Sequence, residues 1–327
     1  MKWLKFLLLA IGFVALWMII QSVGIKLIVS NISHLGWWFL PILSIYAVVY
    51  FFNTLGWFYS FPKNLPTHVP LKNLYALRVI GETLNAVLPF TASVGGEPVK
   101  AQVLKSKYGI SLSEGYASSL IIHITLCVSL NLFAIGALLI ALQNIQLPSL
   151  LWEGLAIFLL TLIAGGILLF LGLYFGIFSQ LYRIGDFFKV WGERSEEKKL
   201  KYLDLDTHIR KFFTHDKRNF FLSSFFNLLG WLSGAVEVYF IAQVMGLPLT
   251  WQEAWLLEAS IQILRMVTFL IPSSIGAQDG GIVLLFLQMG FENTVGVTFA
   301  VVRRLREIIW IGICLLLWAI LKDEKKA

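Results

Sequence analysis

The sequence predicts an all-α protein that crosses a membrane several times. Of its 327 residues, 58% are hydrophobic and only 14% are charged, whereas soluble globular domains average about 25% charged residues. A helix needs about 20 apolar residues to cross the hydrocarbon core of a bilayer. Six segments of the chain meet this requirement: 3–21, 35–60, 115–143, 151–178, 219–246 and 292–321. This composition argues against a nucleic-acid binder, a secreted disulfide scaffold or a soluble enzyme.

The distribution of lysine and arginine predicts on which side of the membrane each connection lies. The stretch 179–218 carries ten of these residues and 61–78 carries three, while 143–153 and 246–254 carry none. Because basic residues collect in cytoplasmic loops, the first two stretches are expected inside and the other two outside. The sequence therefore predicts a multi-pass protein of the cell (inner, cytoplasmic) membrane with both termini in the cytoplasm. The same loops explain the net charge of +7.

Two further apolar regions, 74–106 and 255–290, are interrupted by proline, glycine and a carboxylate. The orientation of the flanking spans requires the first to enter and leave on the cytoplasmic side and the second on the outer side. We therefore expect two opposed re-entrant hairpins, because broken helices at membrane depth must be buried in protein or line a wet cavity. The expected hinge residues are Pro89, Gly95, Gly96, Pro272, Gly276 and Gly280.

The two interrupted regions also repeat one pattern. Gly109 and Gly290 are separated by 181 residues, and so are Gly115 and Gly296, while the proline and the carboxylate match within two residues. The halves 35–143 and 219–321 have opposite predicted directions. The sequence thus predicts a single membrane domain over 1–327 with an inverted repeat, which is the architecture of many transporters.

The cytoplasmic loop 179–218 is expected to contain an amphipathic helix. Over 196–217, apolar residues recur at helical spacing with charges between them, which is typical of a helix lying on a membrane surface. This helix includes Asp204-Leu-Asp206, a pair of carboxylates of the kind that holds a metal–nucleotide complex in glycosyltransferases. Without a supporting motif, we expect these carboxylates to belong to a solvated helix face.

Charged residues at membrane depth are costly and mark function by default. Arg303 and Arg306 lie well inside the last predicted span, together with Arg304 and only one carboxylate, Glu307. The excess positive charge suits a lipid phosphate. We expect His123 and Glu237 to pair internally, and we expect no cofactor or metal site. The candidate substrate-binding residues are Arg78, Glu97, Lys100, Arg265, Asp279, Arg303 and Arg306.

These features resemble those of a known family. The Gly95-Gly96-Glu97 turn, Gly109-Ile110-Ser111 and the Pro272…Gly276…Asp279-Gly280-Gly281 stretch are similar to the transmembrane region of lysylphosphatidylglycerol synthases, over about residues 10–321. The resemblance implies a flippase-like domain whose partners are an anionic or phosphate-bearing lipid and lipid-biosynthesis enzymes. Members often carry a Glu-Arg pair in the span after the first hairpin, where this chain has His123.

The function that we expect is the movement of a lipid or lipid-linked intermediate across the bilayer. The synthases carry a soluble aminoacyltransferase domain after the last span, whereas this sequence ends there, so the chain resembles a stand-alone member of the family without the synthase domain. We therefore expect no lysylphosphatidylglycerol synthesis and no enzyme activity. Two alternatives stay open. One is a membrane-embedded glycosyl or acyl transferase, suggested by Asp204 and Asp206. The other is an ion-coupled carrier of small solutes with Glu97 and Asp279 as proton sites.

Overall fold

A computed structural model describes residues 26, 30, 35–61, 67–87, 95–144, 149–187, 195–267, 274 and 276–323 of the chain. All regular structure within these residues is helical, as the sequence predicts. The predicted first span at 3–21 and the hinge residues Pro89 and Pro272 lie outside the described residues. The helices are η1 (Gly36–Trp38), α3 (Phe39–Phe58), α4 (Leu71–Val87), α5 (Glu97–Tyr108), α6 (Leu112–Asn144), α7 (Ser149–Tyr174), α8 (Ile177–Phe187), α9 (Ser195–His215), α10 (Lys217–Val244), α11 (Trp251–Val267), α12 (Ala277–Gln288) and α13 (Asn293–Asp323).

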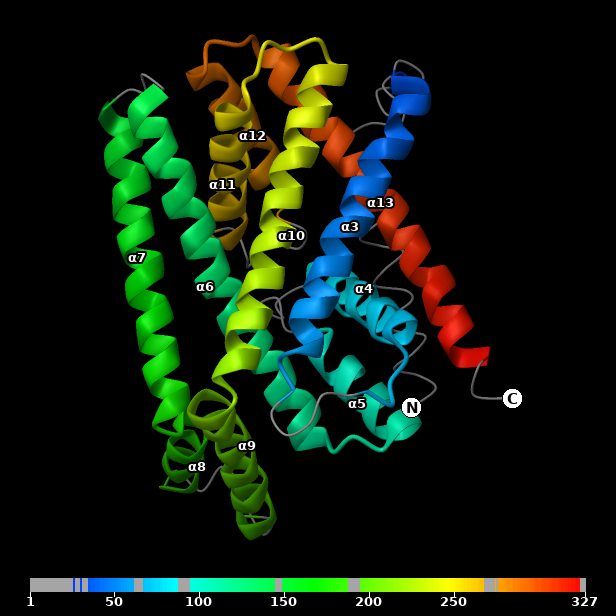
Figure 1. Ribbon diagram of the computed structural model, residues 1–327, viewed down its shortest axis with the longest axis vertical. Helices are drawn as coiled ribbons and strands as arrows, with labels where there is room; N and C mark the ends of the chain where they lie inside the picture. Colours follow the sequence, from blue (N-terminus) through cyan, green and yellow to red (C-terminus); the bar gives the residue numbers. More distant parts are fainter. Residues whose placement is uncertain are drawn as a thin grey trace.

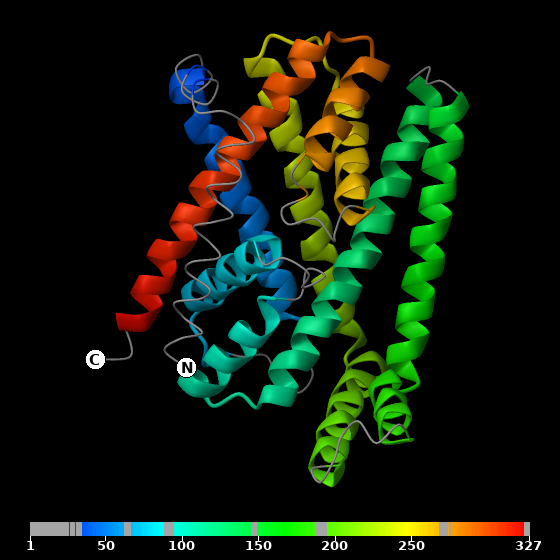
Figure 2. The same cartoon turned by 180° about the vertical axis from the view of Figure 1, so that it is seen from behind.

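Five long helices, α3, α6, α7, α10 and α13, run along the long axis of the molecule (Figure 1). Successive long helices run in alternating directions (Figure 1). A pair of short helices lies between α3 and α6, and another lies between α10 and α13. The first short pair, α4 and α5, lies toward the lower end in Figure 1, and the second pair, α11 and α12, lies toward the upper end, as the reverse view in Figure 2 also shows. Each pair therefore occupies a different end of the bundle.

In the described part of the chain, three helices are long and apolar enough to cross a membrane: Gly36–Phe58, Leu112–Ile140 and Lys217–Val244. They confirm the spans predicted at 35–60, 115–143 and 219–246. A fourth is added if the pair Ile163–Gly172 and Ile177–Ile184, which is bent by 70°, forms one span. The region 292–321 forms α13, but this helix does not reach the same apolarity because three arginines and a glutamate lie at its centre.

Helices α3 and α10 cross at the core of the bundle, and each contributes one asparagine and one glycine to the contact. A Cβ atom on Gly56 would lie 2.8 Å from Cγ of Asn227, and a Cβ atom on Gly230 would lie 2.8 Å from Oδ1 of Asn53. Only glycine leaves room for these asparagines without displacing them. The reciprocal contact follows from a motif that occurs in both helices, Asn-x-Leu-Gly-Trp, at 53–57 and 227–231.

The tryptophans of this motif connect both helices to α6. Nε1 of Trp57 donates a hydrogen bond to Oγ of Ser118 at 3.1 Å, and Nε1 of Trp231 donates one to Oγ of Ser129 at 3.1 Å. A satisfied N–H is what lets a tryptophan be buried at little cost. The tryptophans of the two copies of the motif thus bind serines at two different levels of α6.

The short helices of the two halves match in length and in their ends. Helices α5 and α12 have 12 residues each, and the described parts of α4 and α11 have 17 each. Gly109, with φ 72°, follows the end of α5, and Gly290, with φ 85°, follows the end of α12. Glycine adopts this left-handed conformation without a steric penalty. In addition, α4 packs against α13, the last helix of the other half, while α11 packs against α6.

The predicted amphipathic helix at 196–217 is confirmed as α9, but its predicted position is wrong. Leu205, Ile209 and Phe213 on its apolar side pack with residues of α6 and α8, and Phe212 is fully buried. This side of α9 therefore faces protein rather than a membrane surface. Helical spacing reveals an apolar face, but it does not reveal whether a lipid or another helix covers it.

Candidate functional site

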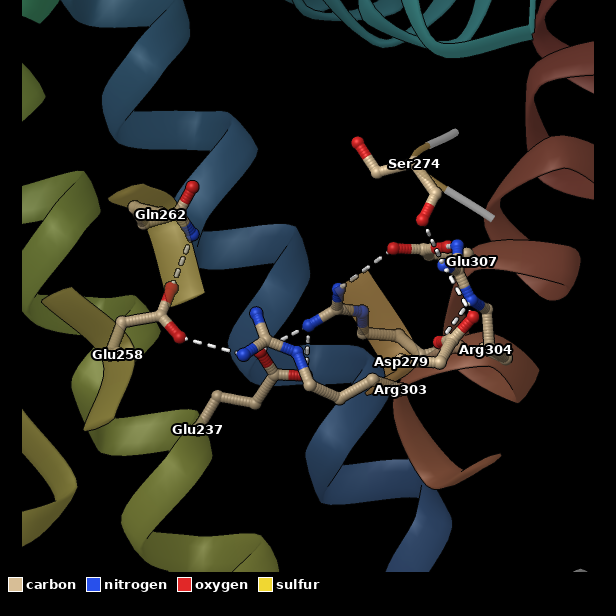
Figure 3. A network of polar contacts seen from close by, with 9 residues as sticks. Glu237, Glu258, Gln262, Ser274, Asp279, Arg303, Arg304 and Glu307 are labelled. Atoms are coloured by element: carbon tan, nitrogen blue, oxygen red, sulfur yellow. Dashed lines mark hydrogen bonds and ion pairs between the residues drawn. The ribbon is translucent and has the colours of Figure 1, made fainter. Parts of the chain in front are cut away.

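The charged side chains at the centre of α13 lie within one network of ion pairs (Figure 3). Nη1 of Arg303 lies 2.8 Å from Oε2 of Glu258 on α11, and both side chains are buried. The other oxygen of Glu258 accepts a hydrogen bond from Nε2 of Gln262 at 2.5 Å. Arg303 therefore joins α13 to α11 and has its own carboxylate partner.

Arg304 joins α13 to the start of α12. Its Nε and Nη2 donate to the two oxygens of Asp279 at 2.8 Å and 3.0 Å, and its Nη1 donates to Glu307 at 2.7 Å. Asp279 also accepts a hydrogen bond from the backbone N–H of Gly276 at 2.9 Å, which caps the N-terminus of α12. One carboxylate thus holds both the first turn of α12 and the arginine of the neighbouring helix.

Arg306 forms the most deeply buried pair of the network. It donates to both oxygens of Glu237 on α10, and neither side chain has any exposed surface. Its guanidinium carbon lies 3.8 Å from the centre of the Tyr46 ring on α3. A guanidinium held over an aromatic face gains further electrostatic stabilisation.

The expectation of unneutralised positive charge in this region is wrong. Each of the three arginines has a carboxylate partner, and these partners lie on α10, α11 and α12 as well as on α13. Spacing along one helix shows only i, i+3 and i, i+4 pairs, so counting charges within α13 missed the partners from other helices. The expectation that Glu237 pairs internally is met.

A second polar cluster lies between α4 and α5. Nζ of Lys100 lies 2.8 Å from Oε2 of Glu97, and Oε1 of Glu97 accepts a hydrogen bond from Nδ2 of Asn85 at 3.2 Å. The backbone N–H of Gly96 donates to Oδ1 of Asn85 at 2.6 Å. A Cβ atom on Gly96 would lie 2.7 Å from the carbonyl carbon of Gly81, so this close approach of the two helices requires glycine.

His123 completes this cluster from α6. Its Nε2 lies 4.0 Å from Oε1 of Glu97, and 33% of its side chain is exposed. The pair of His123 and Glu97 corresponds to the pair of Arg304 and Asp279. His123 and Arg304 are 181 residues apart in the sequence, and Glu97 and Asp279 are 182 residues apart. A carboxylate at the start of a short helix therefore faces a basic side chain of the following long helix in both halves.

Three side chains of the two clusters are the least covered by protein: His123, Glu82 and Asp279. Glu82 is 32% exposed and Asp279 28%, whereas the Arg78, Lys100, Arg303, Arg304 and Arg306 side chains are at most 3% exposed. Nη1 of Arg78 lies 3.1 Å from Oε1 of Glu82. Arg265 is half-buried and lies within electrostatic range of Glu307 and Tyr46. The least covered groups of the two clusters are thus two carboxylates and a histidine.

The remaining candidate hinge residues lie at the starts of the short helices. Gly95 and Gly96 precede α5, and Gly276, with φ 77°, precedes α12. Gly280 lies in the first turn of α12, where a Cβ atom would meet nothing within 4 Å. The N-termini of α5 and α12 already carry Glu97 and Asp279, so the positive end of each helix has a carboxylate of the chain itself.

Asp206 has a local structural role. It accepts hydrogen bonds from the backbone N–H groups of Ser179 at 2.7 Å and Phe178 at 3.3 Å, and thereby caps the first turn of α8. Asp204 accepts a hydrogen bond from Ser113 at the start of α6. Within the described part of the chain, no group of three His, Cys, Asp or Glu residues could hold a metal ion.

Comparison with known protein families decides the assignment. The family model described as "Lysylphosphatidylglycerol synthase TM region" matches residues 3–316. The chain belongs to this family. No curated protein and no solved structure matches the chain. As a member of the lysylphosphatidylglycerol synthase transmembrane-region family with apolar spanning helices, it is a membrane protein, and the family associates it with the handling of lipids.

Several residues of the two clusters were not among the expected site residues. Asn85, Gln262 and Tyr46 carry no charge, so a search for intramembrane charges passes over them. Glu258 and Glu237 carry charge, but their partners are distant in sequence. The internal repeat is the feature of the sequence that points to these clusters. Aligning the two halves places His123 opposite Arg304 and Glu97 opposite Asp279.

Proposed function

We propose that this protein binds the headgroup of a membrane lipid or lipid-linked intermediate between its two halves and carries it across the bilayer. The observation that supports this most directly is the pair of polar clusters inside a bundle of apolar helices. Moving a polar headgroup alone through hydrocarbon costs several kcal/mol for each unsatisfied group. Side chains placed along the path offset that cost, while the acyl chains stay in the lipid.

The architecture that we propose is an inverted repeat with six full spans and two opposed re-entrant hairpins. Four matches between the halves support it: the reciprocal Asn–Gly contacts of α3 and α10, the equal lengths of the short helices, the glycines that end them, and the crossed packing of α4 on α13 and α11 on α6. In this arrangement both termini lie in the cytoplasm of a cell whose inner membrane holds the protein. Such repeats allow one half to rock against the other around a central site.

The chemistry of the clusters suggests which headgroups fit. Glu82, Asp279 and Glu307 offer carboxylate oxygens, which accept hydrogen bonds from hydroxyl or amine groups. We therefore propose a phosphate-bearing lipid whose headgroup carries hydrogen-bond donors. The sequence suggested an anionic headgroup because three arginines of α13 share one carboxylate on that helix. Each of these arginines has a carboxylate partner in the structure, so they support an anionic headgroup less strongly than expected.

The test is reconstitution of the purified protein into liposomes that contain a trace of headgroup-labelled phospholipid. A membrane-impermeant quencher then reports the labelled fraction on each leaflet over time. We expect the wild type to accelerate exchange between leaflets relative to protein-free liposomes. Glu82→Gln, which removes the most exposed carboxylate of the cluster between α4 and α5, should slow it. Glu196→Gln, at an exposed carboxylate of α9 outside both clusters, is the matched control.

Equal incorporation and equal melting temperature of the three proteins are required for the comparison. Exchange no faster than in protein-free liposomes, for lipids with anionic, zwitterionic and sugar headgroups alike, would contradict the proposed function. Uptake of small labelled solutes with no lipid exchange would instead support the solute-carrier alternative.

A further inference from the structure

We propose that His123 is a proton-binding site, and that its protonation and the binding of a phosphate-bearing headgroup favour each other. The inference rests in part on the proposed function, because it names the ion that accompanies the lipid. His123 occupies in the first half the place that Arg304 occupies in the second. The second half therefore has a permanently charged pair, Arg304–Asp279, where the first has a pair whose charge depends on a proton.

The hydrogen bonding of the imidazole determines where that proton goes. Nδ1 of His123 lies 2.6 Å from the backbone oxygen of Ser119. A carbonyl oxygen only accepts hydrogen bonds, so Nδ1 carries the hydrogen of the neutral ring. Nε2 then has a lone pair and faces Oε1 of Glu97 at 4.0 Å. A proton taken up at Nε2 converts this unfavourable contact of lone pair and carboxylate into an ion pair.

The other groups around His123 make the consequence of protonation a change of net charge. Among the described residues, His123 interacts electrostatically with Glu97 on α5 and Glu82 on α4, and these carboxylates are paired with Lys100 and Arg78. These two acids and two bases balance while His123 is neutral, and Tyr116 on its own helix is neutral as well. Protonation of His123 therefore gives the cluster one net positive charge.

In the described part of the chain, the other helices that pack on α6 bring no charged side chain to this position. Asp204 and His208 of α9 lie at Ser113, near the start of α6. Among the described residues, the contacts of α3, α7, α9, α10 and α11 with the middle of α6 involve uncharged residues, among them Trp57, Gly166, Ile209, Ser223, Asn227 and Trp255. The charge gained on protonation is thus not cancelled by a neighbouring helix.

One positive charge in a previously balanced cluster favours an anion at the same place. A phosphate diester brings one negative charge, so proton and lipid bind together without leaving net charge inside the membrane. Linkage makes the effect reciprocal: an anionic lipid must raise the affinity for the proton by the same factor as the proton raises the affinity for the lipid. The exposed part of the His123 ring gives the proton access from solvent.

The first measurement observes the proton itself and needs no transport. The protein with ¹⁵N-labelled histidine is placed in nanodiscs of phosphatidylcholine or of phosphatidylglycerol, and the imidazole signals are followed by NMR between about pH 5 and pH 8, where histidines titrate. We expect one titrating signal to be missing in His123→Gln and retained in His215→Gln, the control at an exposed histidine of α9. Its midpoint should lie at higher pH in phosphatidylglycerol.

The second measurement is the pH dependence of lipid exchange in liposomes. Wild type and His215→Gln should exchange labelled phosphatidylglycerol several-fold faster at the low end of this pH range. His123→Gln should be slow at every pH, and His123→Arg, which carries the permanent charge found at Arg304, should show no pH dependence. An NMR midpoint that is the same in both lipids, or a His123→Gln profile equal to that of the wild type, would overturn the proposal. Absence of lipid exchange in all proteins would refute only the proposed function, because the NMR titration still decides on the proton site.

Discussion

Asn227 of α10 lies directly over Gly56 of α3, where a Cβ atom would lie 2.8 Å from the asparagine Cγ. The asparagine is fully buried, and its Nδ2 donates a hydrogen bond to Oγ1 of Thr125 at 3.0 Å. The hydrogen bond to Thr125 therefore holds the Asn227 side chain in its position over Gly56. The reciprocal contact of Asn53 with Gly230 makes this crossing the point at which the two halves meet as equivalents.

Substitution of the glycine at this crossing should destabilise the protein. Gly56→Ala forces Asn227 away from Thr125 or α3 away from α10, and overpacking of this kind costs about 1–3 kcal/mol. We expect a lower melting temperature in detergent, and the same for Gly230→Ala. Gly312→Ala is the control, because that helical glycine has nothing within 4 Å of its Cβ position. Equal melting temperatures for all three variants would show that the crossing tolerates a methyl group.

The proposed inverted repeat predicts that the ends of α5 and α12 face opposite sides of the membrane. In a variant without Cys127 and Cys314, single cysteines at Lys105 and Glu292, both exposed, should react with an impermeant thiol reagent from opposite sides. Lys105→Cys should be labelled only from the cytoplasm and Glu292→Cys only from outside. Reporter fusions should place Pro248 outside, and Glu196 and Asp323 inside. Labelling of both cysteines from the same side would exclude the inverted arrangement.

The pair of Arg306 and Glu237 should contribute to stability only as long as both members are present. Removing one partner of a fully buried pair leaves a charge without compensation and costs about 3–5 kcal/mol. We expect Arg306→Met and Glu237→Leu to lower the yield of folded protein, and the double variant to recover most of it. Size-exclusion profiles and melting curves of the four proteins measure this cycle. Single variants as stable as the wild type would mean that the pair is not buried as described.

Asp206 should matter for local stability and not for lipid exchange. Asp206→Ala removes the cap of α8, and such substitutions cost about 0.5–2 kcal/mol. Hydrogen exchange at the first turn of α8 should therefore accelerate, while the rate of lipid exchange stays unchanged. Asp204→Ala should have a smaller effect on α8, since its carboxylate contacts Ser113 instead. A folded Asp206→Ala protein that has lost its activity would revive the transferase alternative.

The sequence predicts the helical class, three spans that the structure contains, and the helix at 196–217 that the structure has as α9, because all of these depend on local periodicity and hydropathy. It does not predict the partners of Arg303 and Arg306, which come from helices far away in sequence. For the same reason it misplaces the apolar side of α9, since α6 is the surface that covers Ile209. The Asn-x-Leu-Gly-Trp repeat was available in the sequence and identifies the crossing of α3 and α10.

The central claim is that a lipid headgroup passes between the two halves, and photo-cross-linking tests it most directly. A phospholipid with a photoreactive group on its headgroup is incorporated into liposomes with the protein, illuminated, and the adducts are located by mass spectrometry. The account predicts adducts on α4, α12 and α13 around Glu82, Asp279 and Glu307, and their loss when an unlabelled lipid of the same headgroup is added in excess. Adducts found only at outward-facing positions such as Leu168 and Leu316, which are 70% and 66% exposed, would contradict it.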